Sequence, residues 1–125
     1  MLADKSAMAT IPVKDLAAAK KFYEGTLKFK KLEEEGEEAV TYQTGKSEVV
    51  VYRSDFAGTN RATAATWDVG DEIEGIVKDL KTKGVPFEHY EMPGMQLQGD
   101  IHVADGMKAA WFKDPDGNIL ALTSH

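Results

Sequence analysis

The chain has 125 residues, which is enough for one domain spanning residues 1–125, and 42% of them are hydrophobic, as in an ordinary globular protein. The absence of cysteine excludes disulfides, zinc-thiolate sites and cysteine nucleophiles, and the formal charge of −6 argues against a nucleic-acid-binding surface. No basic start precedes an apolar run, and no stretch approaches the roughly 20 apolar residues of a membrane span, so we expect a cytoplasmic protein without nucleic-acid or membrane partners.

The first half of the sequence predicts a strand, a helix and further strands. Residues 9–15, ATIPVKD, read as a short strand ending at Asp15, a residue type that caps helices. We expect the following helix to end at Gly25. Its apolar face is predicted to comprise Leu16, Ala19, Phe22 and Tyr23. Strands are then expected at about residues 30–35, 38–44 and 48–54.

The second half repeats this order. Residues 65–71, ATWDVGD, share the pattern A-T-x-x-V-x-D with the first strand, and Asp71 and Glu74 have the spacing of a helix-capping box. Gly84 is placed to end this helix. Its predicted apolar face is Ile73, Ile76, Val77 and Leu80. Strands are expected at about residues 86–92, 107–113 and 118–124, and the turn DPDGN joins the last pair.

The chain therefore reads β-α-β-β-β twice, at about residues 8–55 and 63–124, which predicts an α+β fold. With this doubled unit, the stretches IPVKDLAAAKKFY and WFKDPDGN resemble the vicinal oxygen chelate superfamily, which includes glyoxalase, bleomycin-resistance and extradiol dioxygenase proteins. The resemblance covers about residues 8–123. It implies two βαβββ modules in a cupped mixed sheet with the helices outside, a small-molecule cleft inside, and a homodimer.

The resemblance also implies a set of metal-ligand positions. Metal-using members take ligands at the start of each module, in the last strand of the first module, and just after the final turn. In this chain these positions hold Met8, Ala64, Ala121 and one of Val49, Val50 and Val51. Divalent metals of this kind need carboxylate or imidazole donors. We therefore expect no metal and no other cofactor.

Strand side chains alternate between two faces, and this sorts the residues of the expected cleft. Trp111 is expected opposite Ala121 in the final hairpin, where it either contacts a ligand or fills the space of the missing metal. Arg53 is expected at the cleft rim, with a solvated strand-end charge as the alternative. The residues predicted to face the core instead are Ile11, Val13, Tyr42, Trp67 and Val69. The predicted ligand-binding residues are Met8, Thr10, Thr41, Val51, Arg53, Ala64, Thr66, Tyr90, His102, Ala109, Trp111 and Ala121.

The least regular stretch, residues 87–106, is rich in Met, Gly and Gln. We expect it to lie over the cleft mouth as a mobile flap, since Met suits an adaptable binding surface. Tyr90, Met95 and His102 are the flap residues of interest. His102 is the candidate acid or base, because histidine titrates near neutral pH, and an ordinary polar loop residue is the alternative.

These observations favour a metal-independent small-molecule binding protein that holds an antibiotic or another apolar or aromatic compound without chemistry. One alternative is a glyoxalase-like lyase or a dioxygenase with unconventional metal ligands. Another is a metal-free enzyme that uses His102, with Tyr90 or Arg53 in support. A structural or regulatory module with a protein partner is the last alternative.

Overall fold

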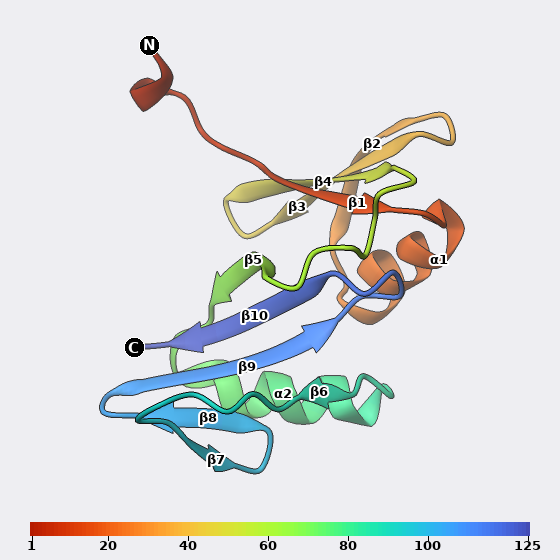
Figure 1. Cartoon of the computed structure of the whole chain (residues 1–125). Coiled ribbons are helices and arrows are strands. Elements are labelled where there is room, and N and C mark those ends of the chain that lie inside the picture. Colours follow the sequence, from red (N-terminus) through yellow and green to blue (C-terminus); the bar gives the residue numbers. More distant parts are fainter. The chain divides into compact units, whose positions relative to one another are not determined.

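The computed structural model describes residues 1–125 and consists of ten strands and two α-helices (Figure 1). They form two compact units, a first unit of residues 1–60 and a second unit of residues 61–125. Each unit combines one helix with a sheet that has parallel and antiparallel neighbours, which confirms the predicted α+β class. Neither helix has the length and the apolar composition of a membrane span.

The first unit has the predicted β-α-β-β-β order. After a 3-10 turn (Leu2–Asp4), its elements are β1 (Ala9–Val13), α1 (Leu16–Lys20) with a π-helical continuation (Lys21–Thr26), β2 (Lys30–Glu35), β3 (Ala39–Thr44) and β4 (Ser47–Arg53). The sheet has the order β1-β4-β3-β2, in which β1 and β4 are parallel and the other neighbours antiparallel. The valine-rich β4 therefore lies inside the sheet, where β-branched side chains pack well.

The helix of the first unit begins as predicted and ends later than predicted. The side chain of Asp15 accepts a hydrogen bond from the backbone N–H of Ala18 at 3.1 Å, which caps α1. Gly25 does not end the helix, because it lies inside the π-helical continuation. The chain leaves the helical conformation at Lys28, whose φ is 63°. The wider π-helical turn thus carries the chain past the glycine.

The core of the first unit lies between α1 and one face of its sheet. Ile11, Val13 and Tyr42 are fully buried, as predicted. The ring of Tyr42 stacks on that of Tyr23, with centroids 6.1 Å apart, and its hydroxyl donates to the Glu24 carboxylate at 2.7 Å. Burial and the nearby carboxylate raise the pKa of Tyr42, so the phenol stays a hydrogen-bond donor.

The second unit contains more strands than predicted. Its elements are β5 (Thr63–Asp68), a 3-10 turn (Gly70–Glu72), α2 (Ile73–Thr82), β6 (Phe87–Glu88), β7 (Gln96–Gln98), β8 (Ile101–Ala104), β9 (Met107–Lys113) and β10 (Ile119–Ser124). The sheet order is β5-β10-β9-β8-β7, and β6 also pairs with β9. The prediction that residues 87–106 form a flap was wrong, because this stretch contains β6, β7 and β8, which all pair within the sheet.

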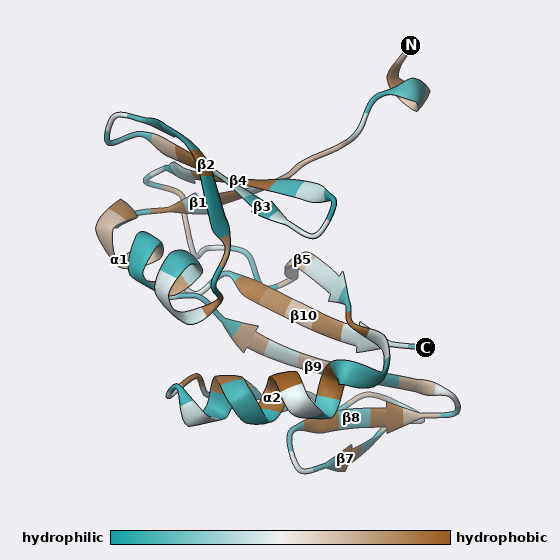
Figure 2. Ribbon diagram, turned by 180° about the vertical axis from the view of Figure 1, so that it is seen from behind, coloured by the Kyte–Doolittle hydropathy of each residue, from teal (hydrophilic) through white to brown (hydrophobic).

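The helix of the second unit has the predicted apolar face but not the predicted cap. Ile73, Val77 and Leu80 are buried, and Figure 2 shows hydrophobic and hydrophilic residues alternating around α2. The capping box was wrong: the preceding 3-10 turn leaves no side-chain cap, and the Glu74 side chain pairs with Lys108 instead. Gly84 follows the helix with a φ of 87°, as expected for a helix-ending glycine.

The hairpin of β9 and β10 forms as the sequence predicts. The Asp114 carboxylate accepts backbone N–H bonds from Asp116 at 3.0 Å and Asn118 at 2.8 Å, which closes the turn. Trp111 lies directly opposite Ala121, as predicted. Trp67 pairs with Leu122 but stays partly exposed, because β5 is the edge strand of this sheet.

Candidate functional site

Three rings from different segments of the second unit meet on one side of its sheet. We call Tyr90, His102 and Trp111 the aromatic cluster. The centroids of the His102 and Trp111 rings are 4.8 Å apart at 85°, and those of Tyr90 and Trp111 are 5.4 Å apart at 74°. Such edge-to-face contacts are favourable because the positive edge of one ring meets the negative face of the other. The structure thus brings together three residues that the sequence proposed for the site.

The position of Trp111 is fixed by strand pairing at its backbone and by a hydrogen bond at its indole nitrogen. Its Cα position on β9 pairs with Ala121 on β10, which in turn pairs with Thr66 on β5. Its indole N–H donates to the hydroxyl of Thr63 at 3.2 Å. We call the sheet face that carries these residues the Trp111 face. The small side chains of Ala109 and Ala121 are buried beside the indole.

Thr63 is a site residue that the sequence did not reveal. Regular alternation places Ala64 on the same face as Thr66. In the structure the pairing of β5 and β10 shifts by one residue, so that Thr63 pairs with Ile119 and Ala65 pairs with Leu120. Ala64 is therefore the extra residue of a bulge and has no partner position on β10. No residue type in this stretch signals the bulge.

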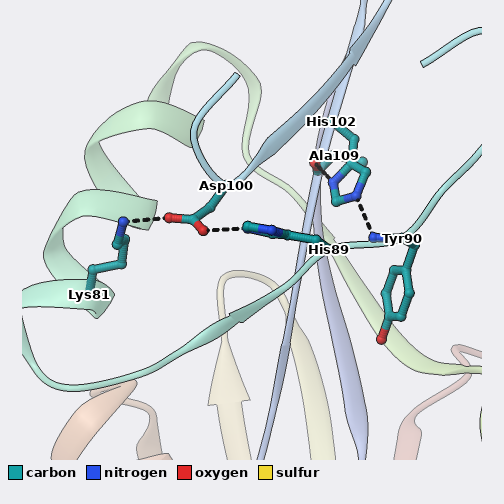
Figure 3. Close-up of polar contacts among 6 residues, drawn as sticks. All are labelled: Lys81, His89, Tyr90, Asp100, His102 and Ala109. Carbon is teal, nitrogen blue, oxygen red and sulfur yellow. Dashed lines mark hydrogen bonds and ion pairs between the residues drawn. The ribbon is translucent and has the colours of Figure 1, made fainter. Parts of the chain in front are cut away.

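His102 is part of β8 and not of a loop. It pairs with Ala109 on β9 and only 1% of it is exposed. Its Nε2 accepts the backbone N–H of Tyr90 at 2.9 Å, and its Nδ1 lies 3.3 Å from the Ala109 carbonyl oxygen (Figure 3). The neutral tautomer with hydrogen on Nδ1 satisfies both contacts. Main-chain groups therefore occupy both ring nitrogens, which is the environment of a structural histidine.

The hydroxyl of Tyr90 is buried and has no hydrogen-bond partner, although the rest of the side chain is partly exposed. Burial raises the pKa of the phenol, and the Glu88 carboxylate raises it further while Lys113 lowers it. Glu88 and Lys113 themselves form an ion pair at 3.3 Å. The aromatic cluster thus contains one uncharged polar group that has no hydrogen-bond partner within the chain.

The predicted site residues of the first unit lie on two different faces. Thr10 and Thr41 both pair with Val50, so these residues share a face, and Met8 precedes β1 and is 50% exposed. Val51 was wrongly placed with them, because it pairs with Ile11 and Val40 on the fully buried face. In a strand, an error of one residue moves a side chain to the opposite face.

Arg53 has the surroundings of a solvated strand-end charge, the alternative to its predicted place at the cleft rim. It ends β4 and is in register with the buried Val13, so it does not share the face of Thr10 and Thr41. Its guanidinium pairs with Asp55 at 3.1 Å. It also borders a surface hollow of about 420 Å³ together with residues at the start of α1. Arg53 is therefore a solvated strand-end charge.

The residues at the family's metal positions do not fit a divalent metal. Met8 has a thioether, and Ala64, Ala121 and the valines of β4 have no donor atom at all. No three or more His, Cys, Asp or Glu side chains group closely enough to hold a metal ion. The donor set of this chain thus offers no route for metal chemistry at these positions.

A second polar network joins α2 to the hairpin of β7 and β8. The Asp100 carboxylate accepts from Lys81 at 2.5 Å and from His89 at 2.7 Å (Figure 3). Lys81 and His89 hold the pKa of Asp100 below its ordinary value. The sequence did not reveal this network, because its members come from three separate segments. It connects the segment that carries Tyr90 to the helix side of the unit.

Solved structures with the same fold cover nearly the whole chain. A glyoxalase family protein from Enterococcus faecalis is 21% identical, with a TM-score of 0.74 over 99% of this chain and 100% of that one. The integron cassette protein HFX_CASS4 from the mobile metagenome of the Halifax Harbour sewage outfall is 20% identical, with a TM-score of 0.73 over 98% and 99%. The fosfomycin resistance protein FosX from Listeria monocytogenes, complexed with Mn(II) and sulfate, is 15% identical, with a TM-score of 0.70 over 97% and 90%.

The family comparison spans most of the sequence. A search of curated proteins found no match. The family model described as Glyoxalase/Bleomycin resistance protein/Dioxygenase superfamily matches residues 5–122, which span both β-α-β-β-β units except for the end of β10. The chain therefore belongs to this superfamily, the vicinal oxygen chelate group that its doubled pattern resembles.

Proposed function

We propose that the protein binds a small apolar or aromatic compound on the Trp111 face without a metal and without chemistry, as an antibiotic-sequestering protein does. The observation that carries the proposal is the aromatic cluster next to the buried Ala109 and Ala121. Ligand sites are commonly lined by aromatic and apolar side chains with a few polar groups for orientation. A large fixed indole beside small neighbours suits a flat ligand.

Binding is favoured over catalysis because the histidine and the carboxylate near the cluster are already engaged. A general acid or base needs a nitrogen or oxygen within reach of the substrate, and both nitrogens of His102 contact main-chain groups. The carboxylate of Glu88 is paired with Lys113. The family's metal positions lack donors, so a metal Lewis acid has no ligands there.

The proposal includes a cytoplasmic homodimer. A chain without cysteine suits a reducing compartment. Members of the superfamily often pair, and in such pairs both chains can shape each ligand site.

Native mass spectrometry of the protein, purified without chelator, tests this proposal. It reports subunit count, bound metal and any retained ligand in one measurement. We expect a metal-free dimer, and an organic adduct would give the mass of the ligand. A stoichiometric metal would contradict the proposal and favour the metal-dependent alternative, for which FosX with Mn(II) is a structural neighbour.

Tryptophan fluorescence supplies the binding test. In a Trp67→Phe variant, Trp111 is the only remaining tryptophan, because the chain has two. We expect aromatic compounds to quench this emission in a saturable manner. In the matched Trp111→Phe variant, where Trp67 reports, we expect no saturable quenching. Equal quenching in both variants would place the ligand elsewhere.

A further inference from the structure

The Tyr90 hydroxyl differs from the buried hydroxyl of Tyr42 in the first unit. In the first unit the Tyr42 hydroxyl donates to Glu24 at 2.7 Å. In the second unit the Tyr90 hydroxyl is buried with no partner. Buried hydroxyl groups in native proteins are nearly always hydrogen-bonded, because an unpaired one loses its hydrogen bonds to water and gains none within the protein. The exception therefore leaves a donor for which the chain itself supplies no acceptor.

The position of this hydroxyl is fixed by contacts at the other end of the residue. The backbone N–H of Tyr90 donates to the buried ring of His102 at 2.9 Å, and the phenol ring packs edge-to-face on Trp111. A rotation that took the hydroxyl to solvent would break the ring contact. The phenol is thus held against the aromatic cluster, and a ligand that packs on Trp111 would lie beside it.

The local charge favours a neutral ligand. Two charged groups act on the Tyr90 phenol, the Glu88 carboxylate and the Lys113 ammonium, and they form an ion pair with each other at 3.3 Å. The whole chain carries a formal charge of −6. An anionic ligand would be repelled, whereas a carbonyl oxygen accepts a hydrogen bond without a net charge. Because its pKa is raised, the phenol keeps its proton and remains a donor.

We propose that the Tyr90 hydroxyl determines the specificity of the Trp111 face, by donating a hydrogen bond to the carbonyl oxygen of a neutral aromatic ligand that packs against Trp111. This inference rests on the proposed function, since it names the class of ligand for the same face. Aromatic ketones, amides and quinones carry the required oxygen. Hydrocarbons of the same shape lack it and would leave the hydroxyl unpaired.

A matched pair of probes tests the inference. 2-Acetylnaphthalene and 2-isopropenylnaphthalene differ only in a carbonyl oxygen that replaces a methylene group. In the Trp67→Phe protein, quenching of Trp111 is expected to show about three- to tenfold tighter binding of the ketone, the range that one net hydrogen bond supplies. When Tyr90→Phe is added, we expect the ratio to fall to about one while binding of the hydrocarbon changes less than about twofold.

The outcomes separate the inference from the function on which it rests. If both probes bind and the ratio is the same with and without the Tyr90→Phe substitution, the inference is wrong and the binding face stands. If neither probe binds either protein, the proposed function fails and the inference fails with it. If Tyr90→Phe weakens both probes equally, the side chain acts only by packing, and the inference is overturned.

Thermal unfolding of the ligand-free protein gives an independent readout. Tyr90→Phe removes an unpaired buried hydroxyl, so we expect its Tm to equal or exceed that of the parent. The control Tyr42→Phe removes a hydroxyl that is bonded to Glu24, so we expect its Tm to fall. A fall in Tm for Tyr90→Phe as large as that of the control would mean that the hydroxyl already has a partner within the protein, and this would overturn the inference.

Discussion

The two units share one order of elements and differ in what their sheets carry. In the first unit, only two of the seven residues of β4 are buried, and the face of Thr10 and Thr41 has no aromatic cluster. In the second unit, five of the six residues of β10 are buried and the aromatic cluster lies on the side of Ala121. The repeat therefore supplies a scaffold, and the side chains on one sheet make the candidate site.

The largest expected difference between the two units is the loss of stability when a glutamate is introduced into each sheet. Ala121→Glu places a charge at a position that is 2% exposed, so we expect the free energy of unfolding to fall by about 3–5 kcal/mol, as for other unpaired buried charges. Thr10→Glu in the first unit is the control, and its exposed position predicts a change within about 0.5 kcal/mol. Urea denaturation measures both values. Equal losses would mean that the two sheet faces are equally buried.

Removing one buried polar group from each unit gives the next largest effect. His102→Leu deprives two main-chain groups of partners, so we expect a loss of about 2–4 kcal/mol in the free energy of unfolding. Tyr42→Phe removes one bond and is expected to cost about 1 kcal/mol. Chemical denaturation of both variants provides the comparison. A folded, fully stable His102→Leu protein would contradict the structural role of this histidine.

An exposed aromatic residue of the first unit sharpens the assignment of the ligand face. Trp111→Ala is expected to weaken binding of 2-acetylnaphthalene by about 2 kcal/mol, roughly 30-fold, as for a central aromatic contact. Tyr52 is 37% exposed and shares the face of Val50, so Tyr52→Ala is the matched control with little expected effect. Equilibrium dialysis measures both affinities. A comparable loss in the control would assign the binding to both units.

The smallest expected effect concerns the Asp100 network. The pKa of Asp100 is lowered in the folded protein, so its contribution to stability is present above the ordinary aspartate value of about 4 and is lost as the pH falls through the folded value. Asp100→Asn is expected to cost about 0.5–1 kcal/mol at pH 7, the range of a surface ion pair.

The pH dependence of this variant separates charge from shape. We expect its difference from the parent protein to shrink as the pH falls below the ordinary aspartate value and to vanish below the lowered pKa of Asp100. Lys20 and Glu34 form the corresponding pair in the first unit, where the pKa of Glu34 is also lowered. Glu34→Gln should follow the same trend with pH. A difference for Asp100→Asn that does not change with pH would show that packing, not charge, matters there.

Local patterns predicted much of the fold. The repeated A-T-x-x-V-x-D, the apolar faces of the helices and the DPDGN turn fixed the order of elements, since each depends on residues that are near in sequence. The placement of Trp111 opposite Ala121 followed from the same turn, because a short hairpin sets its own register. Burial of Tyr42 followed from alternation along β3.

The rest depended on pairing between distant segments. The bulge that brings Thr63 to Trp111 arises where β5 meets β10, and no local signal marks it. Strands β7 and β8 are too short to show a pattern of alternation, so the sequence did not predict that His102 is buried. Val51 was misplaced because an alignment that is uncertain by one residue loses all information about the face.

Each sheet contains a parallel pair between the first and last strands of its unit. Ala9 pairs with Val49, a separation of 40 residues, and Thr63 pairs with Ile119, a separation of 56 residues. The entropy of loop closure grows only with the logarithm of length, so these two separations differ in cost by about 0.3 kcal/mol. The two units therefore face nearly the same kinetic barrier from topology, and a difference between their folding rates would come from side-chain packing rather than from the path of the chain.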